Sequence, residues 1–226
     1  MNLPKPIKFE VDRYVGGLSQ FNKIKNPIKL SANESALGPS PKAIEAFEKE
    51  KNKILKYPES DSNSLREVLA QKFKIDSKRI ICGSGSDQIF DLTCRLFIEP
   101  GDEVIVTEFG FLMHKIYASL YKAKVVLAKE KNFRASVEEI TKKVSDKTKI
   151  VFIANPNNPT GTYLSKNEIL DLRKKLRSDI LLVVDDAYCE FINSSNFIGL
   201  LEPRLIISYS RGVVKASTKP LTISET

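Results

Sequence analysis

Two neighbouring carboxylates, Asp185 and Asp186, directly follow the apolar residues 180–184. A negative charge at the end of a buried strand is costly unless a cation lies beside it. The protonated ring nitrogen of a bound ligand would be such a cation. The alternative is that one aspartate simply caps the next turn, so the pair alone leaves both a ligand site and a structural cap open.

A loop of small residues, Gly-Ser-Gly-Ser-Asp at positions 83–87, follows another apolar run and precedes a predicted helix. Such a loop presents backbone N–H groups and the positive end of the helix dipole, which together suit a phosphate. A plain turn with Ser86 or Asp87 as the helix N-cap has the same composition. The loop alone therefore indicates an anion site without requiring one.

A third polar segment, Asn-Pro-Asn-Asn-Pro-Thr-Gly at positions 155–161, follows the apolar residues 150–154. Its two prolines fix the backbone, and its asparagines offer amide donors and acceptors at the end of a strand. A purely structural loop is possible here too. The composition is nevertheless much rarer than that of a glycine turn.

The elements that must position these segments form an alternating pattern. Apolar runs predict strands at residues 79–82, 104–106, 124–127, 150–154, 180–184 and 205–208. The predicted helices cover residues 41–53, 64–73, 87–97, 111–120, 136–144 and 165–176. This alternation predicts an α/β fold, a mostly parallel sheet with helices on both faces. Ligands bind such sheets at the carboxyl ends of the strands, where all three polar segments lie.

The positions of proline and glycine along the chain predict the domain organisation. Residues 1–40 contain several prolines and a Gly16–Gly17 pair, which predicts an extended N-terminal arm. Ser40 and Pro41 suit the N-cap and first position of a helix, so we expect one large domain over residues 41–226.

Composition excludes several classes of function. The net charge is +8, but the lysines are spread along the chain without a basic cluster, which argues against nucleic-acid binding. No apolar run is long enough for a membrane span. The three cysteines form no CxxC pair, so neither a metal site nor a disulfide framework is expected. We expect a cytoplasmic protein.

Taken together and in order, the segments resemble the pyridoxal-phosphate (PLP)-dependent aminotransferases of classes I and II, in particular the histidinol-phosphate group. Residues 155–161 resemble that family's N-P-N-N-P-T-G, residues 185–188 its D-E-A-Y and residues 85–87 its G-S-D. Further matches are residues 30–34, 38–41, 57–58, 65–66, 100–102 and Phe111. The resemblance covers residues 28–208 and implies the large domain of PLP-transferase fold type I.

The resemblance implies a role for each matching residue around the cofactor ring. Asp185 would pair with the pyridine nitrogen, and Phe111 would stack on the ring. Asn158 and Tyr188 would bind the phenolic oxygen. The single histidine, His114, is expected to be a structural side chain with satisfied hydrogen bonds.

Other positions match those that hold the phosphate and the substrate in the family. Gly85, Ser86, Asp87 and Ser210 are implied in cofactor binding. Tyr57 matches a tyrosine that reaches the phosphate in the neighbouring subunit, which implies a homodimer. Asn33 would lie near the substrate.

The sequence departs from the family after residues 205–208. The family has a Ser-Lys pair there, whose lysine forms a Schiff base with the cofactor. Ser210 matches the serine, but Arg211 stands in the lysine's place, and a guanidinium offers no free amine. Lys215, one helical turn on if the helix continues, is the alternative. Lys219 stands where the family has a phosphate-binding arginine.

The resemblance implies amino transfer from histidinol phosphate or an aromatic amino acid to 2-oxoglutarate, with PLP as the cofactor. The family's C-terminal small domain has no counterpart up to Thr226, so we expect a C-terminally truncated chain with an incomplete large domain. The alternative function is therefore a catalytically inactive homologue or remnant. A PLP lyase or decarboxylase is disfavoured, because residues 155–161 and 185–188 follow the aminotransferase pattern.

Overall fold

The computed structural model describes residues 14, 16, 28, 30–35, 37–192, 206–210 and 213–216, the last two ranges by their backbone. Two compact units divide the chain, one formed by Arg13–Ser62 and the other containing the residues from Asn63 onward. The division into an arm at 1–40 and a large domain at 41–226 stays a prediction.

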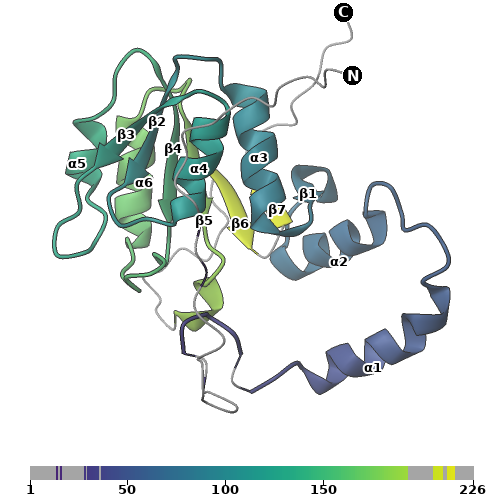
Figure 1. The fold of residues 1–226 in the computed structure, drawn as a ribbon. Helices are drawn as coiled ribbons and strands as arrows, with labels where there is room; N and C mark the ends of the chain where they lie inside the picture. Colours follow the sequence, from purple (N-terminus) through teal and green to yellow (C-terminus); the bar gives the residue numbers. More distant parts are fainter. Residues whose placement is uncertain are drawn as a thin grey trace, which may run out of the picture. The chain divides into compact units, whose positions relative to one another are not determined.

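The larger unit is built on one sheet whose order is β1-β7-β6-β5-β4-β2-β3 (Figure 1). Its strands are β1 (Ile80–Cys82), β2 (Glu103–Thr107), β3 (Lys124–Ala128), β4 (Thr148–Ala154), β5 (Leu181–Asp185), β6 (Ile206–Ser210) and β7 (Val213–Ala216). The strands from β3 through β6 run parallel, and β7 is antiparallel to both β6 and β1. The predicted α/β fold with a mostly parallel sheet is confirmed.

Strand β7 corrects the expected placement of Lys215, which the sequence put one helical turn beyond Arg211. The backbone returns directly as β7, and Lys215 pairs with Ile80 of β1 and Ser208 of β6. The residues 213–216, Val-Val-Lys-Ala, are rich in β-branched side chains, which favour strands. Lys215 therefore lies within a strand instead of one helical turn beyond Arg211.

Helices of the larger unit cover both faces of the sheet. The helices of this unit are α2 (Asn63–Phe73), α3 (Gly85–Phe97), α4 (Leu112–Leu120), α5 (Val137–Thr141) and α6 (Lys166–Lys175), and the smaller unit contains α1 (Pro41–Glu50). Helices α3 and α4 lie on one face of the sheet, and α5 and α6 lie on the other. Short 3-10 turns cover Lys51–Lys53, Ser77–Arg79 and Cys189–Phe191. A capping box at Ser165 and Glu168 starts α6. At α1, Pro41 occupies the predicted first position, but the Ser40 side chain makes no capping hydrogen bond.

Alternate residues of the central strands build two separate cores. Val151 and Ile153 of β4 pack with Ile169 of α6 on one face. Ile150 and Phe152 pack on the other face, in the cluster that contains side chains of α3 and α4. The period of two in a strand explains this division, because successive side chains point to opposite faces. The central strands β2, β4 and β5 are therefore buried on both faces, as the continuously apolar runs predicted.

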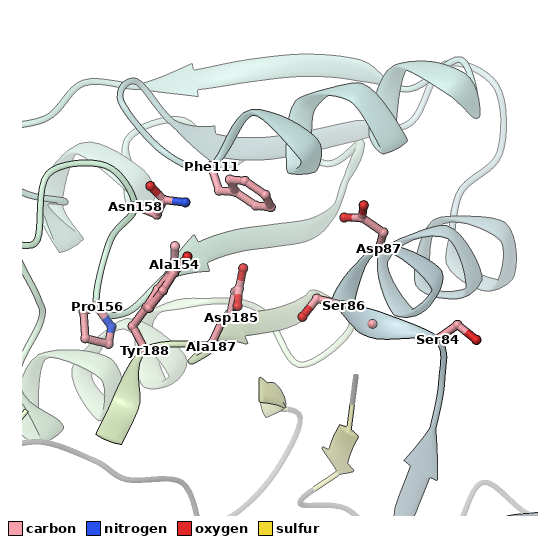
Figure 2. Close-up of a pocket in the computed structure, with 11 residues that line it drawn as sticks. Ser84, Ser86, Asp87, Phe111, Ala154, Pro156, Asn158, Asp185, Ala187 and Tyr188 are labelled. Atoms are coloured by element: carbon pink, nitrogen blue, oxygen red, sulfur yellow. Dashed lines mark hydrogen bonds between the residues drawn. The ribbon is translucent and has the colours of Figure 1, made fainter. Parts of the chain in front are cut away.

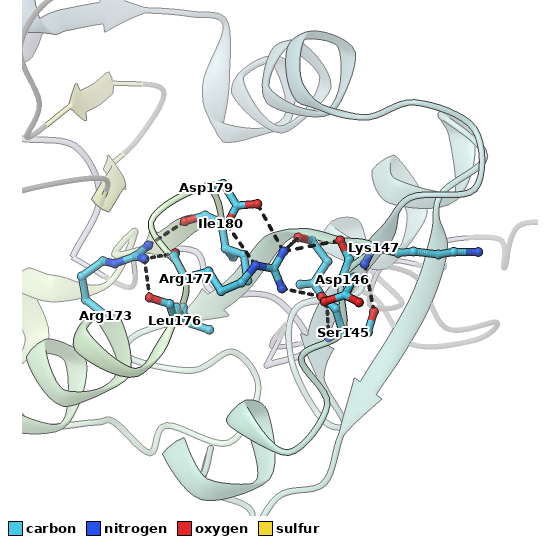
Figure 3. A network of polar contacts seen from close by, with 9 residues as sticks. Ser145, Asp146, Lys147, Arg173, Leu176, Arg177, Asp179 and Ile180 are labelled. Atoms are coloured by element: carbon cyan, nitrogen blue, oxygen red, sulfur yellow. Dashed lines mark hydrogen bonds and ion pairs between the residues drawn. The ribbon is translucent and has the colours of Figure 1, made fainter.

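The amino-terminal edge of the sheet is fixed by Arg177, which follows α6 (Figure 3). Its guanidinium donates to the carbonyl oxygens of Ser145 at 2.6 Å and Thr148 at 3.2 Å, and to the carboxylate of Asp179 at 3.1 and 3.3 Å. One turn earlier, Arg173 donates to the carbonyl oxygens of Leu176, Arg177 and Ile180. These arginines hold the starts of β4 and β5 together, which leaves the carboxyl edge open for a site.

Candidate functional site

A pocket lies at the carboxyl edge of the sheet (Figure 2). Four segments supply its walls: the start of α3, the residue before α4, and the loops that follow β4 and β5. Its lining residues are Ser84, Gly85, Ser86, Asp87, Phe111, Ala154, Pro156, Asn158, Asp185, Ala187 and Tyr188. All three polar segments found in the sequence thus meet here, because parallel strands place their carboxyl ends at one edge.

Helix α3 contributes its N-terminus to the pocket. The helix begins at Gly85, whose φ is +81°, and Ser84 is the N-cap residue without a side-chain capping bond. Ser86 and Asp87, the residues predicted as alternative N-caps, instead lie in the first turn of the helix. The first-turn residues thus bring the positive end of the helix dipole to the pocket wall, as an anion site requires.

Asp185 ends β5 with a buried carboxylate that lines the pocket. Its Oδ1 accepts a hydrogen bond from the backbone N–H of Ala187 at 3.2 Å. Its Oδ2 lies 3.3 Å from Nε2 of His114, which belongs to α4 and is 1% exposed. Protein groups therefore fix both oxygens of this carboxylate, and its plane is set before any ligand binds.

His114 itself is held by aromatic rings. It stacks on Phe152 with ring centroids 5.0 Å apart and an interplanar angle of 14°. Phe90 and Phe111 meet it edge-on at 4.8 and 5.7 Å. The burial of His114 agrees with the structural role predicted for it, but its partner Asp185 was not predicted. The i,i+3 spacing of Phe111 and His114 near the start of a predicted helix indicates only that these two side chains lie together.

A second carboxylate gives the pocket a negative field. Burial raises the pKa of Asp87 above its ordinary value, and the charge of Asp185 raises it further, while His114 acts in the opposite direction. A carboxylate whose ionisation is disfavoured by a neighbouring negative charge stabilises a cation that enters beside it. The pocket thus combines a helix start suited to an anion with a carboxylate region suited to a cationic group.

The remaining pocket residues come from the loops after β4 and β5. Figure 2 shows Asn158 and Tyr188 at one end of the pocket and Ser86 at the other, with Asp185 between them. Asn155 anchors the first of these loops, because its amide donates to Leu164 O at 3.0 Å and accepts from Leu164 N at 2.6 Å. The first asparagine of the segment is therefore structural, and Asn158 faces the pocket.

Comparison with known proteins identifies the family. Residues 25–216 match the family model described as aminotransferase class I and II. The chain belongs to this family. A histidinol-phosphate aminotransferase of Pelagibacter ubique is 54% identical over 197 residues, which are 87% of this chain and 55% of that protein. One from Paramagnetospirillum magneticum is 44% identical over 88% of this chain and 55% of its own length.

Solved structures of aminotransferases have the same fold. The histidinol-phosphate aminotransferase of Sinorhizobium meliloti, in complex with pyridoxal-5′-phosphate, gives a TM-score of 0.77 at 23% identity over 82% of this chain and 55% of that one. A putative one from Erwinia carotovora gives 0.78 at 23% identity, covering 90% and 63%. The chain thus has the large-domain fold of PLP-transferase fold type I, and it spans about half the length of the curated relatives it matches.

The described structure does not place several of the residues singled out in the sequence relative to the pocket. Arg211 and Lys219 lie outside the described residues, and Ser210 and Lys215 are described only as backbone of β6 and β7. Tyr57 is fully exposed in the Arg13–Ser62 unit, which also contains Asn33. Their roles stay predictions.

In the described part of the chain, the His, Cys, Asp and Glu side chains form no group of three or more that could hold a metal ion. None of the helices in this part combines the length and the apolar character that a membrane span requires.

Proposed function

We propose that the pocket binds PLP and that the protein transfers an amino group from histidinol phosphate or an aromatic amino acid to 2-oxoglutarate. The observation that carries the proposal is the buried carboxylate of Asp185, which lines a pocket whose wall includes the uncapped start of α3. A protonated pyridine ring with a phosphate group needs both features. Family membership and the names of the relatives support the same assignment.

The residues present fit the cofactor. The first turn of α3, with Gly85, Ser86 and Asp87, binds the phosphate through its backbone amides and the Ser86 hydroxyl. Asp185 binds the ring nitrogen and keeps its proton in place, because an ionised partner favours the protonated ring. His114 acts behind Asp185 as a positioning residue. Bound PLP supplies an electron sink for the negative charge that develops at the substrate Cα.

Three other pocket residues orient the ring. Phe111 packs against its face, because its side chain lies at the pocket wall against the edge of His114. Asn158 and Tyr188 donate hydrogen bonds to the phenolic oxygen, since both carry donors and line the same end of the pocket (Figure 2). Ser210 and Asn33 complete the cofactor and substrate contacts.

We further propose a cytoplasmic homodimer in which Tyr57 reaches the cofactor phosphate of the partner, with no nucleic acid or membrane as partner. The complete exposure of the Tyr57 side chain is compatible with a contact outside its own unit. Sedimentation velocity tests the dimer directly, and a monomer that still binds the cofactor with full affinity would contradict this role of Tyr57.

A second candidate function is cofactor binding without turnover. The residue that favours it is Arg211, which stands where the family has its Schiff-base lysine. A guanidinium cannot condense with the cofactor aldehyde. Residues of the pocket would then retain PLP by contacts to its ring and phosphate alone.

One experiment separates these functions. The chain is incubated with PLP, and its absorbance spectrum is followed by borohydride reduction and peptide mapping. Bound PLP that is trapped on Lys215 or Lys219 supports amino transfer by this chain, whereas bound PLP without a trapped lysine supports binding without turnover.

A pair of matched substitutions tests the proposed site. We expect Asp185→Asn to weaken PLP binding at least tenfold, since a hydrogen bond to a charged group is worth about 1.5–3 kcal/mol and about 1.4 kcal/mol corresponds to a factor of ten. Asp146→Asn, the same change at an exposed site before β4, should leave the affinity within about twofold. The absence of PLP binding by the unaltered chain would overturn the proposed function.

A further inference from the structure

Phe111 and Asn158 line one pocket but come from different loops. Phe111 ends the segment that follows β2, and Asn158 belongs to the segment that follows β4. Loops are the least constrained parts of a fold, and pocket residues must be held within a fraction of an ångström to orient a ligand. Some contact between the two loops must therefore set their relative position.

The neighbouring residue Asn157 makes that contact. Its side chain is 5% exposed, and Nδ2 donates to the carbonyl oxygen of Phe109 at 3.2 Å and to Oγ1 of Thr160 at 2.9 Å. Its backbone is also fixed, because its N–H donates to Thr162 O and its carbonyl accepts from Gly161 N, both at 2.8 Å. Both hydrogens of the side-chain amide are thus used, one of them on the loop that carries Phe111.

The hydroxyl groups beyond Asn157 allow only one direction of hydrogen bonding. Oγ1 of Thr162 donates to the carbonyl oxygen of Phe133 at 2.9 Å, which uses its single hydrogen. In the 2.9 Å contact between the two threonine hydroxyls, Thr160 must therefore be the donor. Having given its own hydrogen, Thr160 can only accept from Asn157. A carboxylate at position 157 could not take part, because it has no hydrogen to give.

Two aromatic rings connect the two ends of this series of hydrogen bonds. It begins at the carbonyl of Phe109 and ends at that of Phe133, and the rings of these two residues lie 5.3 Å apart. We call the bonded set Phe109, Asn157, Thr160, Thr162 and Phe133 the loop circuit. It joins the loops after β2, β3 and β4 at the edge of the sheet where the pocket lies.

We propose that Asn157 is a positioning residue, which fixes the position of Phe111 relative to Asn158 through the loop circuit. This inference rests on the proposed function. The Asn157 side chain holds Phe109, two residues before the ring-facing Phe111, and lies directly before Asn158. Gly110, between Phe109 and Phe111, transmits the constraint. A Cβ there would lie 2.5 Å from Oγ1 of Thr107, so the turn has little room to shift.

The decisive test substitutes Asn157→Asp, which keeps the size of the side chain and removes both donors. Asn132→Asp is the matched control, an exposed asparagine in the neighbouring loop with the same change of charge. The probe is pyridoxamine 5′-phosphate, which carries the ring and the phosphate and needs no lysine. We expect Asn157→Asp to bind the probe at least tenfold more weakly and to lose most of its induced circular dichroism, and Asn132→Asp to stay within twofold.

Urea unfolding verifies that each variant is folded under the binding conditions. If Asn157→Asp does not fold, Thr162→Val removes the last donor of the circuit with little change of shape, and we expect a loss of about threefold. Affinity and dichroism equal to those of the unaltered chain, in whichever of these variants is folded, overturn the inference.

A double-mutant cycle asks whether Asn157 acts through Phe111. In a Phe111→Ala background, Asn157→Ala should weaken binding much less than it does alone, because the ring that it positions is gone. Additive effects would overturn the inference while leaving the proposed function intact. Failure of the unaltered chain to bind the probe would overturn the proposed function and this inference with it.

Discussion

Nε2 of His114 lies 3.3 Å from Oδ2 of Asp185, and both side chains are almost completely buried. The two residues are 71 positions apart and belong to α4 and β5. The ring of Phe152, in strand β4, stacks on the imidazole of His114 and holds it in place. The carboxylate at the pocket is thus oriented by the packed core of the sheet, whatever the ligand.

Replacing His114 by phenylalanine should destabilise the fold. The substitution keeps an aromatic ring in the cluster but leaves Asp185 Oδ2 without this partner, at a cost of about 1–3 kcal/mol. Urea unfolding measures the loss, and Tyr117→Phe, a change in a neighbouring ring of the same cluster, should stay within about 0.5 kcal/mol. In an Asp185→Asn background the cost of His114→Phe should shrink, because no buried charge remains. Equal costs in both backgrounds would show that the pair is not coupled.

Gly110→Ala should also be destabilising. The added Cβ would lie 2.5 Å from Oγ1 and 3.2 Å from the carbonyl oxygen of the buried Thr107, and relieving such overlap costs about 1–3 kcal/mol. Gly16→Ala is the control, since its Cβ would meet only a ring carbon of Tyr14 at 3.9 Å. Thermal unfolding measures the loss of stability of both variants. In a Thr107→Ala background, Gly110→Ala should cost less stability; an unchanged cost would show that the contact with the Thr107 side chain is not its cause.

Arg177→Lys should cost about 1–3 kcal/mol at the opposite edge of the sheet, although it conserves the charge. A lysine presents one ammonium group and cannot match the fork of bonds to Ser145, Thr148 and Asp179. Arg95→Lys, at an exposed position of α3, is the matched control and should change the free energy of unfolding by less than about 0.5 kcal/mol. If both variants change the free energy of unfolding by the same amount, the hydrogen bonds of Arg177 do not stabilise the fold.

Glu168 predicts a pH-dependent contribution to stability. The hydrogen bond from Arg134, reinforced by bonds from Ser165, lowers the pKa of this carboxyl from 4.5 to about 2. A depressed folded-state pKa gives stability that is present above the unfolded value and is lost as the pH falls toward 2. Because the pair is partly exposed, we expect only about 0.5–1 kcal/mol. The difference in unfolding free energy between the unaltered chain and Glu168→Gln should therefore narrow between pH 6 and pH 3, and parallel profiles would contradict this.

The central strands were predictable because their signal is local. Residues 150–154 and 180–184 are continuously apolar, and the structure places them in β4 and β5 with both faces buried. The polar segments directly after them had to share one edge of a parallel sheet. The position of the pocket was therefore open to prediction from the order of residue types alone.

Strand β7 was not predictable in the same way. Its residues 213–216 favour a strand, but a segment of four residues is too short for its local pattern to distinguish a strand from part of a helix. Pairing with β1, more than 130 positions earlier by the register of Ile80 with Lys215, fixed it as the antiparallel strand between β6 and β1. Long-range pairing overrides local propensity when it supplies backbone hydrogen bonds that the segment cannot make alone.

By itself, the sequence determined the fold class, the carboxyl edge as the place of the pocket, and the residue types that gather there. Only the tertiary structure decided that His114 meets Asp185, that α3 begins at Gly85, and that Asn157 ties two loops together. The physical reason is the same in each case. Patterns along a chain tell which side of an element is buried, whereas the partner of a buried polar group is set by elements that packing brings together from distant positions.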